Sequence, residues 1–174
     1  MTAVDLNVGG DHTPIVKTLH WHDEAATQRF AATLAQVPAL GQAFIELRGE
    51  LGAGKTTLVR HLLQALGVTG RIKSPTYAVV EPYELPGLCI WHFDFYRFSD
   101  PREWEDAGFR DIFASPGLKL AEWADKAAGF IPTPDCVIEL VVAHSDDTST
   151  TPGDEARQVT LTAYSALGRA LLPP

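Results

Sequence analysis

The nine residues GELGAGKTT at 49–57 have the composition and spacing of a nucleotide phosphate loop. Residues 49–56 match G-x-x-x-x-G-K-[ST], in which the glycines allow consecutive N–H groups to point inward around an anion. Lys55 supplies a cation for the outer phosphates, and the hydroxyl of Thr56 is a candidate Mg²⁺ ligand. A glycine-rich turn without a ligand is the alternative. It is disfavoured because a strand candidate precedes the loop and an amphipathic helix candidate follows it.

Two carboxylates stand where strands are predicted to end. Asp94 follows the apolar run in LCIWHFDFYR, and Glu122 ends LKLAE. The carboxyl ends of parallel strands line the ligand crevice of an open sheet, so both side chains are expected near the phosphate loop. There they would hold a metal ion and aim a water molecule. Either carboxylate taken alone fits a solvated loop residue. His92, on the same strand face as Asp94, is a candidate to orient that carboxylate.

The stretch KSPTYAVVEPY lies between the loop and Asp94. Ser74 and Thr76 flank a proline where switch segments often follow the first helix, but a polar turn explains the same residues. Residues 52–80 contain no acidic side chain and include four of the chain's cations. This asymmetry fits a positive field around an anion, and it also fits an ordinary solvated face.

The elements that must position these residues alternate between strands and helices. The pattern predicts a helix at 22–37 with Asp23 as N-cap, and a helix from Lys55 that ends at Gly67. Residues 76–96 read as two strands that turn at Pro86-Gly87. Further strands are expected at 15–21, 42–48 and 117–123, a hairpin from 135–144 and 157–163 across a polar loop at 145–156, and helices at 100–108 and 164–172.

Length and composition predict one domain, residues 1–174, with a flexible N-terminal arm at 1–14. The net charge of −8 disfavours unaided binding of nucleic acid. No apolar stretch reaches about 20 residues and no secretory signal is visible, so a cytoplasmic protein without membrane contact is expected.

Cys89 and Cys136 lie in apolar runs and are expected to be buried free thiols.

Four motifs follow one another along the chain: GELGAGKTT, KSPTYAVVEPY, HFDFYR and LAEW. Their order resembles the TsaE family, the bacterial ATPases of tRNA threonylcarbamoyladenosine biosynthesis. Phosphate loops are common, whereas SPTY followed by HFDxYR and then EW is not a general nucleotidase pattern. The resemblance covers residues 23–140, and neither the N-terminal arm nor the stretch after Ala143 carries such a signature.

The resemblance implies an α/β fold: a P-loop NTPase-like three-layer domain with a mixed, largely parallel central sheet. It also implies an Mg²⁺-dependent ATPase required for N6-threonylcarbamoyladenosine next to the tRNA anticodon. The expected partners are the threonylcarbamoyl transferase subunit and its inactive paralogue, with tRNA contacted mainly through that complex. ATP hydrolysis would be weak in the lone protein and would reset the complex rather than phosphorylate a substrate. Alone, the protein is expected to be a monomer or to self-associate weakly.

The resemblance also assigns roles to residues. Thr56 and Glu122 become the Mg²⁺ ligands, and Asp94 supports the metal or the water. Lys55 is expected to be catalytic together with these carboxylates, and to be solvated in the nucleotide-free protein. The nucleotide-binding set is Gly49, Gly52, Ala53, Gly54, Lys55, Thr56 and Thr57, joined by Thr76 in a switch segment at 74–77, by Trp123 beside the site, and by Glu24 and Thr27 near the nucleoside.

Two other functions fit the phosphate loop. A small phosphotransferase would need an acceptor pocket and a lid, for which Arg97, Arg102 and Arg110 are available. A non-catalytic module would use ATP only to lock one conformation. A phosphotransferase would form a phosphorylated product faster than free phosphate, which distinguishes it from an ATPase. A non-catalytic module is distinguished from an ATPase by measuring ATP turnover in the presence of the partner proteins.

Overall fold

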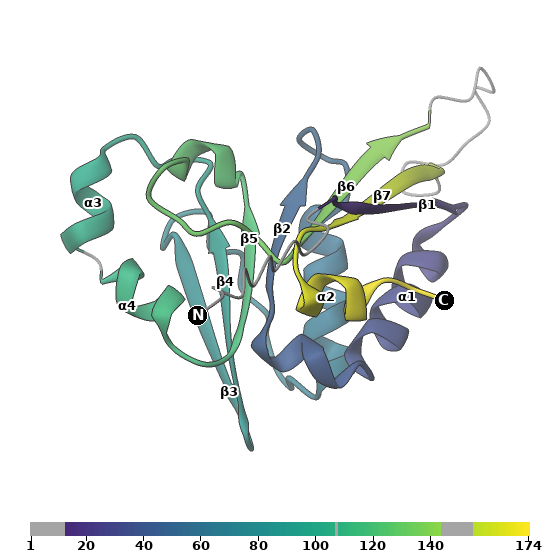
Figure 1. Cartoon of the computed structure of the whole chain (residues 1–174), viewed down its shortest axis with the longest axis horizontal. Coiled ribbons are helices and arrows are strands. Elements are labelled where there is room, and N and C mark those ends of the chain that lie inside the picture. Colours follow the sequence, from purple (N-terminus) through teal and green to yellow (C-terminus); the bar gives the residue numbers. More distant parts are fainter. Residues whose placement is uncertain (1–12, 107, 144–154) are drawn as a thin grey trace, which may run out of the picture.

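The computed structural model describes residues 13–106, 108–143 and 155–174 (Figure 1). Residues 1–12 of the predicted arm and most of the polar loop at 145–156 lie outside these ranges. The strands are β1 (Ile15–Trp21), β2 (Phe44–Arg48), β3 (Val80–Leu85), β4 (Leu88–Asp94), β5 (Leu118–Glu122), β6 (Cys136–Val142) and β7 (Arg157–Ala163). The helices are α1 (Glu24–Ala35), α2 (Lys55–Leu66), α3 (Pro101–Asp106), α4 (Phe109–Ala114) and α5 (Ala166–Leu171), with short 3₁₀ turns η1 (Pro38–Gln42) and η2 (Ala124–Ala127).

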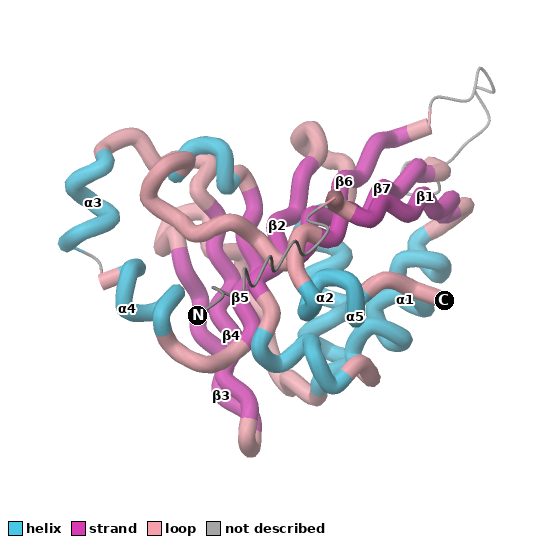
Figure 2. The backbone as a smooth tube through the Cα atoms, in the orientation of Figure 1, coloured by secondary structure: helices cyan, strands magenta, loops and turns pink. Residues whose placement is uncertain are grey.

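The described strands form one sheet in the order β1-β7-β6-β2-β5-β4-β3 (Figure 2). Its centre, β6-β2-β5-β4, is parallel, and the outer strands pair antiparallel. The two predicted hairpins are confirmed as β3–β4 and β6–β7. Strand β2 lies at the middle of the parallel centre, and the phosphate loop follows it directly.

Helices cover both faces of the sheet, which gives three layers. Because side chains alternate along a strand, β2 places Ile45 and Leu47 in a core with α1 and α2, and Phe44 in a second core. The second core is aromatic and includes Trp104 of α3 and Phe109 of α4. Figure 1 shows α3 and α4 at the left of the sheet and α1 and α2 at the lower right. The predicted α/β fold is confirmed.

Local signals set the ends of the two long helices as predicted. The Asp23 carboxylate caps α1 by accepting a hydrogen bond from the backbone N–H of Ala26 at 2.8 Å. Helix α2 begins at Lys55 and ends at Leu66, and the next residue, Gly67, adopts the left-handed conformation of a C-terminal cap. The helix that carries Lys55 and Thr56 is therefore fixed at both ends.

The prediction for the cysteines is half right. Cys136 is buried, and burial raises the pKa of its thiol to about 12. Cys89 is exposed, because it lies one residue inside β4, at the β3–β4 turn that extends beyond the helical layers in Figure 1. No helix in the described part of the chain is long and apolar enough to cross a membrane.

Asp135 joins three segments that are far apart in the sequence. One carboxylate oxygen accepts the backbone N–H of Phe44 at 2.8 Å, and the other accepts the hydroxyl of Ser165 at 2.5 Å. Its carbonyl accepts the N–H of Tyr164 at 2.8 Å. These bonds connect the start of β2, the residue before β6, and the N-cap of α5. They add to the pairing of β2 with β5 and β6 in holding the strand that leads into the phosphate loop.

We predict that Asp135→Ala lowers the free energy of unfolding by about 3 kcal/mol, because the buried N–H of Phe44 loses a charged acceptor. Urea denaturation followed by circular dichroism measures the loss. Glu84→Ala, which removes an exposed carboxylate on β3, is the control and should change stability by less than about 0.5 kcal/mol. Equal stabilities for the two variants would show that Asp135 does not hold β2 in place.

Candidate functional site

The phosphate loop curls between β2 and α2, and its glycines stand where other residues would clash or be strained. Gly49 has a φ of 146°, and a Cβ added there would lie 2.6 Å from the carbonyl oxygen of Leu140. Gly54 is left-handed with a φ of 105° and immediately precedes α2. The loop therefore needs glycine at both ends. The loop leads directly into the N-terminus of α2, where the positive end of the helix dipole favours an anion.

Lys55 is buried in the curl of this loop. Its ammonium donates to the carbonyl oxygens of Gly49 at 2.6 Å and Glu50 at 3.0 Å, and lies 4.5 Å from the ring centroid of Trp123. Only 5% of the residue is exposed, so the expectation of a solvated Lys55 is wrong. The first residues of the loop fold back over the side chain. This desolvation lowers the pKa of Lys55, and the nearby charges of Glu122 and Asp94 oppose the shift.

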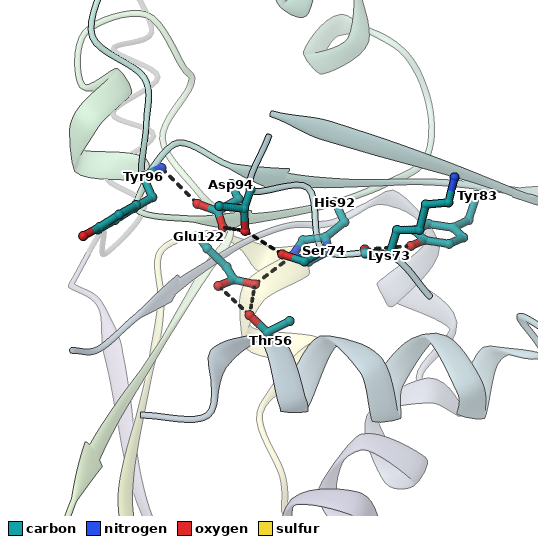
Figure 3. A network of polar contacts seen from close by, with 9 residues as sticks. Thr56, Lys73, Ser74, Tyr83, His92, Asp94, Tyr96 and Glu122 are labelled. Atoms are coloured by element: carbon teal, nitrogen blue, oxygen red, sulfur yellow. Dashed lines mark hydrogen bonds and ion pairs between the residues drawn. The ribbon is translucent and has the colours of Figure 1, made fainter. Parts of the chain in front are cut away.

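Asp94 and Glu122 end adjacent parallel strands and are paired in register. Both are buried, with 6% and 3% of their surface exposed. The hydroxyl of Thr56, on the first turn of α2, lies 3.1 Å from each carboxylate oxygen of Glu122 (Figure 3). The sheet thus brings the two predicted carboxylates together, and α2 adds the predicted hydroxyl.

His92 contacts a different carboxylate from the one proposed. Its Nε2 lies 2.8 Å from Oε1 of Glu122, across the β4–β5 pair, and not against Asp94 (Figure 3). The histidine is 1% exposed, and its Nδ1 is buried without a partner among the described residues. Asp94 is instead held by the N–H of Tyr96 at 2.9 Å. The hypothesis that His92 orients Asp94 is therefore wrong. It was based on the short separation of the two residues along β4, whereas the carboxylate that His92 contacts lies on the neighbouring strand β5.

Burial raises the pKa of the Asp94 carboxyl, and the negative charge of Glu122 raises it further. Two buried carboxylates beside a hydroxyl offer the oxygen ligands that Mg²⁺ prefers. The described residues contain no set of three carboxylate, thiol or imidazole groups that could hold a metal ion alone. Mg²⁺ would therefore need phosphate oxygens and water to complete its shell, as is usual for this ion in nucleotide sites.

The segment at 74–79 reaches the site through Thr76. Its hydroxyl lies 2.7 Å from that of Ser74 and 3.5 Å from Oδ2 of Asp94. Val79, which precedes β3, has a φ of 66°, an unfavourable backbone conformation for a β-branched residue. Tyr77 is 83% exposed. The segment contacts Asp94, and its role as a switch stays a prediction.

A cleft of about 290 Å³ collects most of the predicted residues. It is lined by Leu51, Gly52, Gly54, Lys55, Thr56, Thr57, Thr76, Asp94, Tyr96, Glu122, Trp123 and Arg157. Glu24 does not line it: its carboxylate, on α1, lies 2.8 Å from Nε2 of His61 on α2, and Thr27 is buried. The proposed contact of both residues with a nucleoside stays a prediction.

A larger hollow of about 950 Å³ also borders the loop, and residues 47–53 and 139–142 line much of it. The lining includes neither Lys55, Thr56, Asp94 nor Glu122. The smaller cleft is therefore the site where phosphate chemistry is possible, because the cation, the hydroxyl and both carboxylates face it.

The arginines that could have formed a kinase lid lie elsewhere. The guanidinium of Arg97 lies 4.6 Å from the ring centroid of Tyr77, and that of Arg102 pairs with Asp100 at 3.0 Å. Neither these two nor Arg110 lines the cleft. The arginine that does is Arg157, at the start of β7. Sequence reasoning missed it, because no motif surrounds it and it lies 102 residues after Lys55 in the chain.

Comparison with known proteins finds one family, both among family models and among individual related proteins. The family model described as "Threonylcarbamoyl adenosine biosynthesis protein TsaE" matches residues 21–151. A Haemophilus influenzae protein named "tRNA threonylcarbamoyladenosine biosynthesis protein TsaE" is 38% identical over 145 residues, which cover 83% of this chain and 85% of that protein. A Bacillus subtilis protein of the same name is 34% identical over 119 residues, 68% of each chain.

A solved structure supports the fold. The crystal structure of Bacillus subtilis YdiB superposes with a TM-score of 0.69, covering 92% of this chain and 93% of that one, at 24% identity. At this identity the likeness concerns the fold alone. It agrees with the mixed sheet and the flanking helices described above.

We predict that Asp94→Asn raises the melting temperature of the ligand-free protein by about 2–4 °C at pH 8. Because the pKa of Asp94 is raised in the folded protein, its ionisation opposes folding above that pKa. The advantage of the variant should therefore disappear as the pH falls through the folded pKa toward the unfolded value of 3.8. Differential scanning calorimetry without metal at several pH values measures both effects.

Asp100→Asn is the matched control for this prediction. Arg102 lowers the pKa of the Asp100 carboxyl, so neutralising this exposed residue should not stabilise the protein. A melting temperature of Asp94→Asn at or below that of the wild type at pH 8 would contradict the prediction.

Proposed function

The chain belongs to the TsaE family of threonylcarbamoyl adenosine biosynthesis proteins, and on this premise we propose that it is an Mg²⁺-dependent ATPase in the formation of N6-threonylcarbamoyladenosine in tRNA. It acts with the threonylcarbamoyl transferase subunit and its inactive paralogue, and contacts tRNA mainly through them. ATP hydrolysis resets that complex. The related proteins that carry the family name cover most of this chain, which supports the assignment of the pathway.

The contact of Thr56 with both carboxylate oxygens of Glu122 is the observation that carries the proposal. It places a hydroxyl and a carboxylate together at the N-terminus of α2, beside the curled loop and Lys55. Thr56 and Glu122 are the residues that would hold the metal ion. When bound, Mg²⁺ neutralises charge on the outer phosphates and so makes the terminal phosphoryl group easier to attack.

The remaining residues of the site bind the phosphate chain, orient the attacking water and position the Glu122 carboxylate. The N–H groups of the loop and the dipole of α2 hold the phosphate chain, and the ammonium of Lys55 is pre-oriented by two carbonyls to meet it. The Asp94 carboxylate, fixed by the N–H of Tyr96, faces the same cleft and orients the attacking water by hydrogen bonding. His92 also contacts Oε1 of Glu122 and helps to keep this carboxylate at the cleft.

Hydrolysis fits this site better than transfer to a second substrate. The arginines considered for a kinase lid do not line the cleft, whereas groups suited to phosphate, metal and water do. Incubation with ATP and candidate acceptors tests this choice. We expect free phosphate to form faster than any phosphorylated product.

The pathway and the partners are tested together in cells. We expect the tagged protein to recover the transferase pair from native lysate, more with ATP than without it. Depletion of the gene should leave the corresponding tRNA position unmodified. Full modification in depleted cells would overturn the proposal.

We predict that Glu122→Ala lowers Mg²⁺-dependent, partner-stimulated ATP hydrolysis at least about 100-fold, because the metal loses a carboxylate ligand. Affinity for ADP without Mg²⁺ should fall by less than about threefold, since the loop and Lys55 are retained. Phosphate release and calorimetric titration measure the two quantities.

Thermal unfolding of the variant tests whether the loss of activity reflects a loss of folding, because Glu122 also contacts His92 and Thr56. Glu122→Gln keeps the shape of the side chain and should show the same separation between hydrolysis and binding. Equal loss of hydrolysis and of metal-free ADP binding in both variants would remove Glu122 from the metal site.

A further inference from the structure

Arg157 connects the last strand hairpin to the phosphate loop. Its Nε donates to the carbonyl oxygen of Ala53 at 2.6 Å, and its Nη1 donates to the carbonyl oxygen of Glu155 at 2.7 Å. The guanidinium lies so close to the loop that a Cβ added to Gly54 would be 3.0 Å from Nε. Arg157 lies outside residues 21–151, which the family model matches.

The bond to Ala53 controls the direction of the next N–H group. In a planar trans peptide the C=O and the N–H point in opposite directions. A guanidinium that holds the carbonyl of Ala53 on one side therefore turns the N–H of Gly54 to the other. Gly54 is left-handed and has no side chain to restrict this peptide, so the contact with Arg157 helps to fix it.

The charge of Arg157 is also available to the site. Among the described residues, both acceptors of Arg157 are uncharged carbonyls, so these hydrogen bonds orient the guanidinium without neutralising it. The side chain lines the same cleft as Lys55 and Thr56. A guanidinium matches the geometry of phosphate oxygens, keeps its charge at all physiological pH values, and is more rigid than an ammonium on a flexible stem.

From these observations we infer that Arg157 is a phosphate-positioning residue: it fixes the Ala53–Gly54 peptide for binding and adds a second side-chain cation beside the phosphate chain of a nucleoside di- or triphosphate. This inference rests on the proposed nucleotide site and extends it to β7. The two contributions are separable, because one depends on a hydrogen bond and the other on charge.

The primary test is the affinity for ADP without Mg²⁺, measured by isothermal titration calorimetry on the full chain. We expect Arg157→Ala to weaken binding at least about tenfold, because it removes both contributions. Arg157→Lys retains a charge but not the planar fork, and Arg157→Gln retains an N–H donor but no charge. Each should bind with an affinity between those of the wild type and Arg157→Ala.

Arg102→Ala is the matched control, since Arg102 is exposed and pairs only with Asp100 among the described residues. It should bind ADP within twofold of the wild type. Steady-state hydrolysis with the partner proteins supplies a second measurement. Loss of a contact made equally in the ground and transition states raises KM and leaves kcat within about threefold. A merely structural defect would instead lower the active fraction and leave KM unchanged.

The outcomes separate this inference from the proposed function. A wild-type protein that binds neither ADP nor ATP would remove the nucleotide site itself. A wild type that binds ADP, together with an Arg157→Ala variant within twofold of it, would overturn only the role of Arg157. An Arg157→Ala variant with a lower kcat and an unchanged KM would also overturn only the role of Arg157.

Discussion

The site depends on the path that the backbone takes after β2. This strand lies between β5 and β6, so its loop emerges beside the end of β5, which carries Glu122, and against Leu140 of β6. The close approach of Gly49 to the Leu140 carbonyl leaves no room for a side chain and directs the loop over Lys55. Because all three strands run parallel, their carboxyl ends meet at one edge of the sheet, and the charged groups meet there with them.

Two negative charges are buried side by side at that edge, and each has a different means of support. Glu122 is held between Thr56 and His92, whereas Asp94 depends on the N–H of Tyr96 and a longer contact with Thr76. The cation that faces them, Lys55, is bonded to carbonyls of the loop and not to either carboxylate. Neither carboxylate is therefore paired directly with Lys55, and both face the cleft together with Thr56.

Short sequence patterns were sufficient to predict the features that depend on residues close together in the chain. The glycine-rich turn between a strand and a helix, the cap at Asp23, the end of α2 before Gly67 and the two hairpins all follow from short patterns, and the structure has them where they were predicted. Contacts across the sheet could not be foreseen in this way. His92 faces Glu122 because β4 and β5 are neighbours, and Arg157 reaches Ala53 because β7 folds back beside β6. Likewise, the burial of Lys55 depends on the curl of the loop around it.

Backbone strain is concentrated beside the two carboxylates. Among the described residues, Val79 and Trp123 are the non-glycine residues with positive φ, at 66° and 55°. The N–H of Asp94 donates to the carbonyl of Val79 at 2.8 Å, and Trp123 follows Glu122 directly and stacks over Lys55. Such conformations cost on the order of 1–3 kcal/mol each and persist only where the surroundings impose them. Here the surroundings are the aromatic core below β4 and β5, which contains Phe93, Phe95 and Ala121. Val79 and Trp123 pack against that core, and this packing holds the chain beside the two carboxylates in conformations that local preferences would not select.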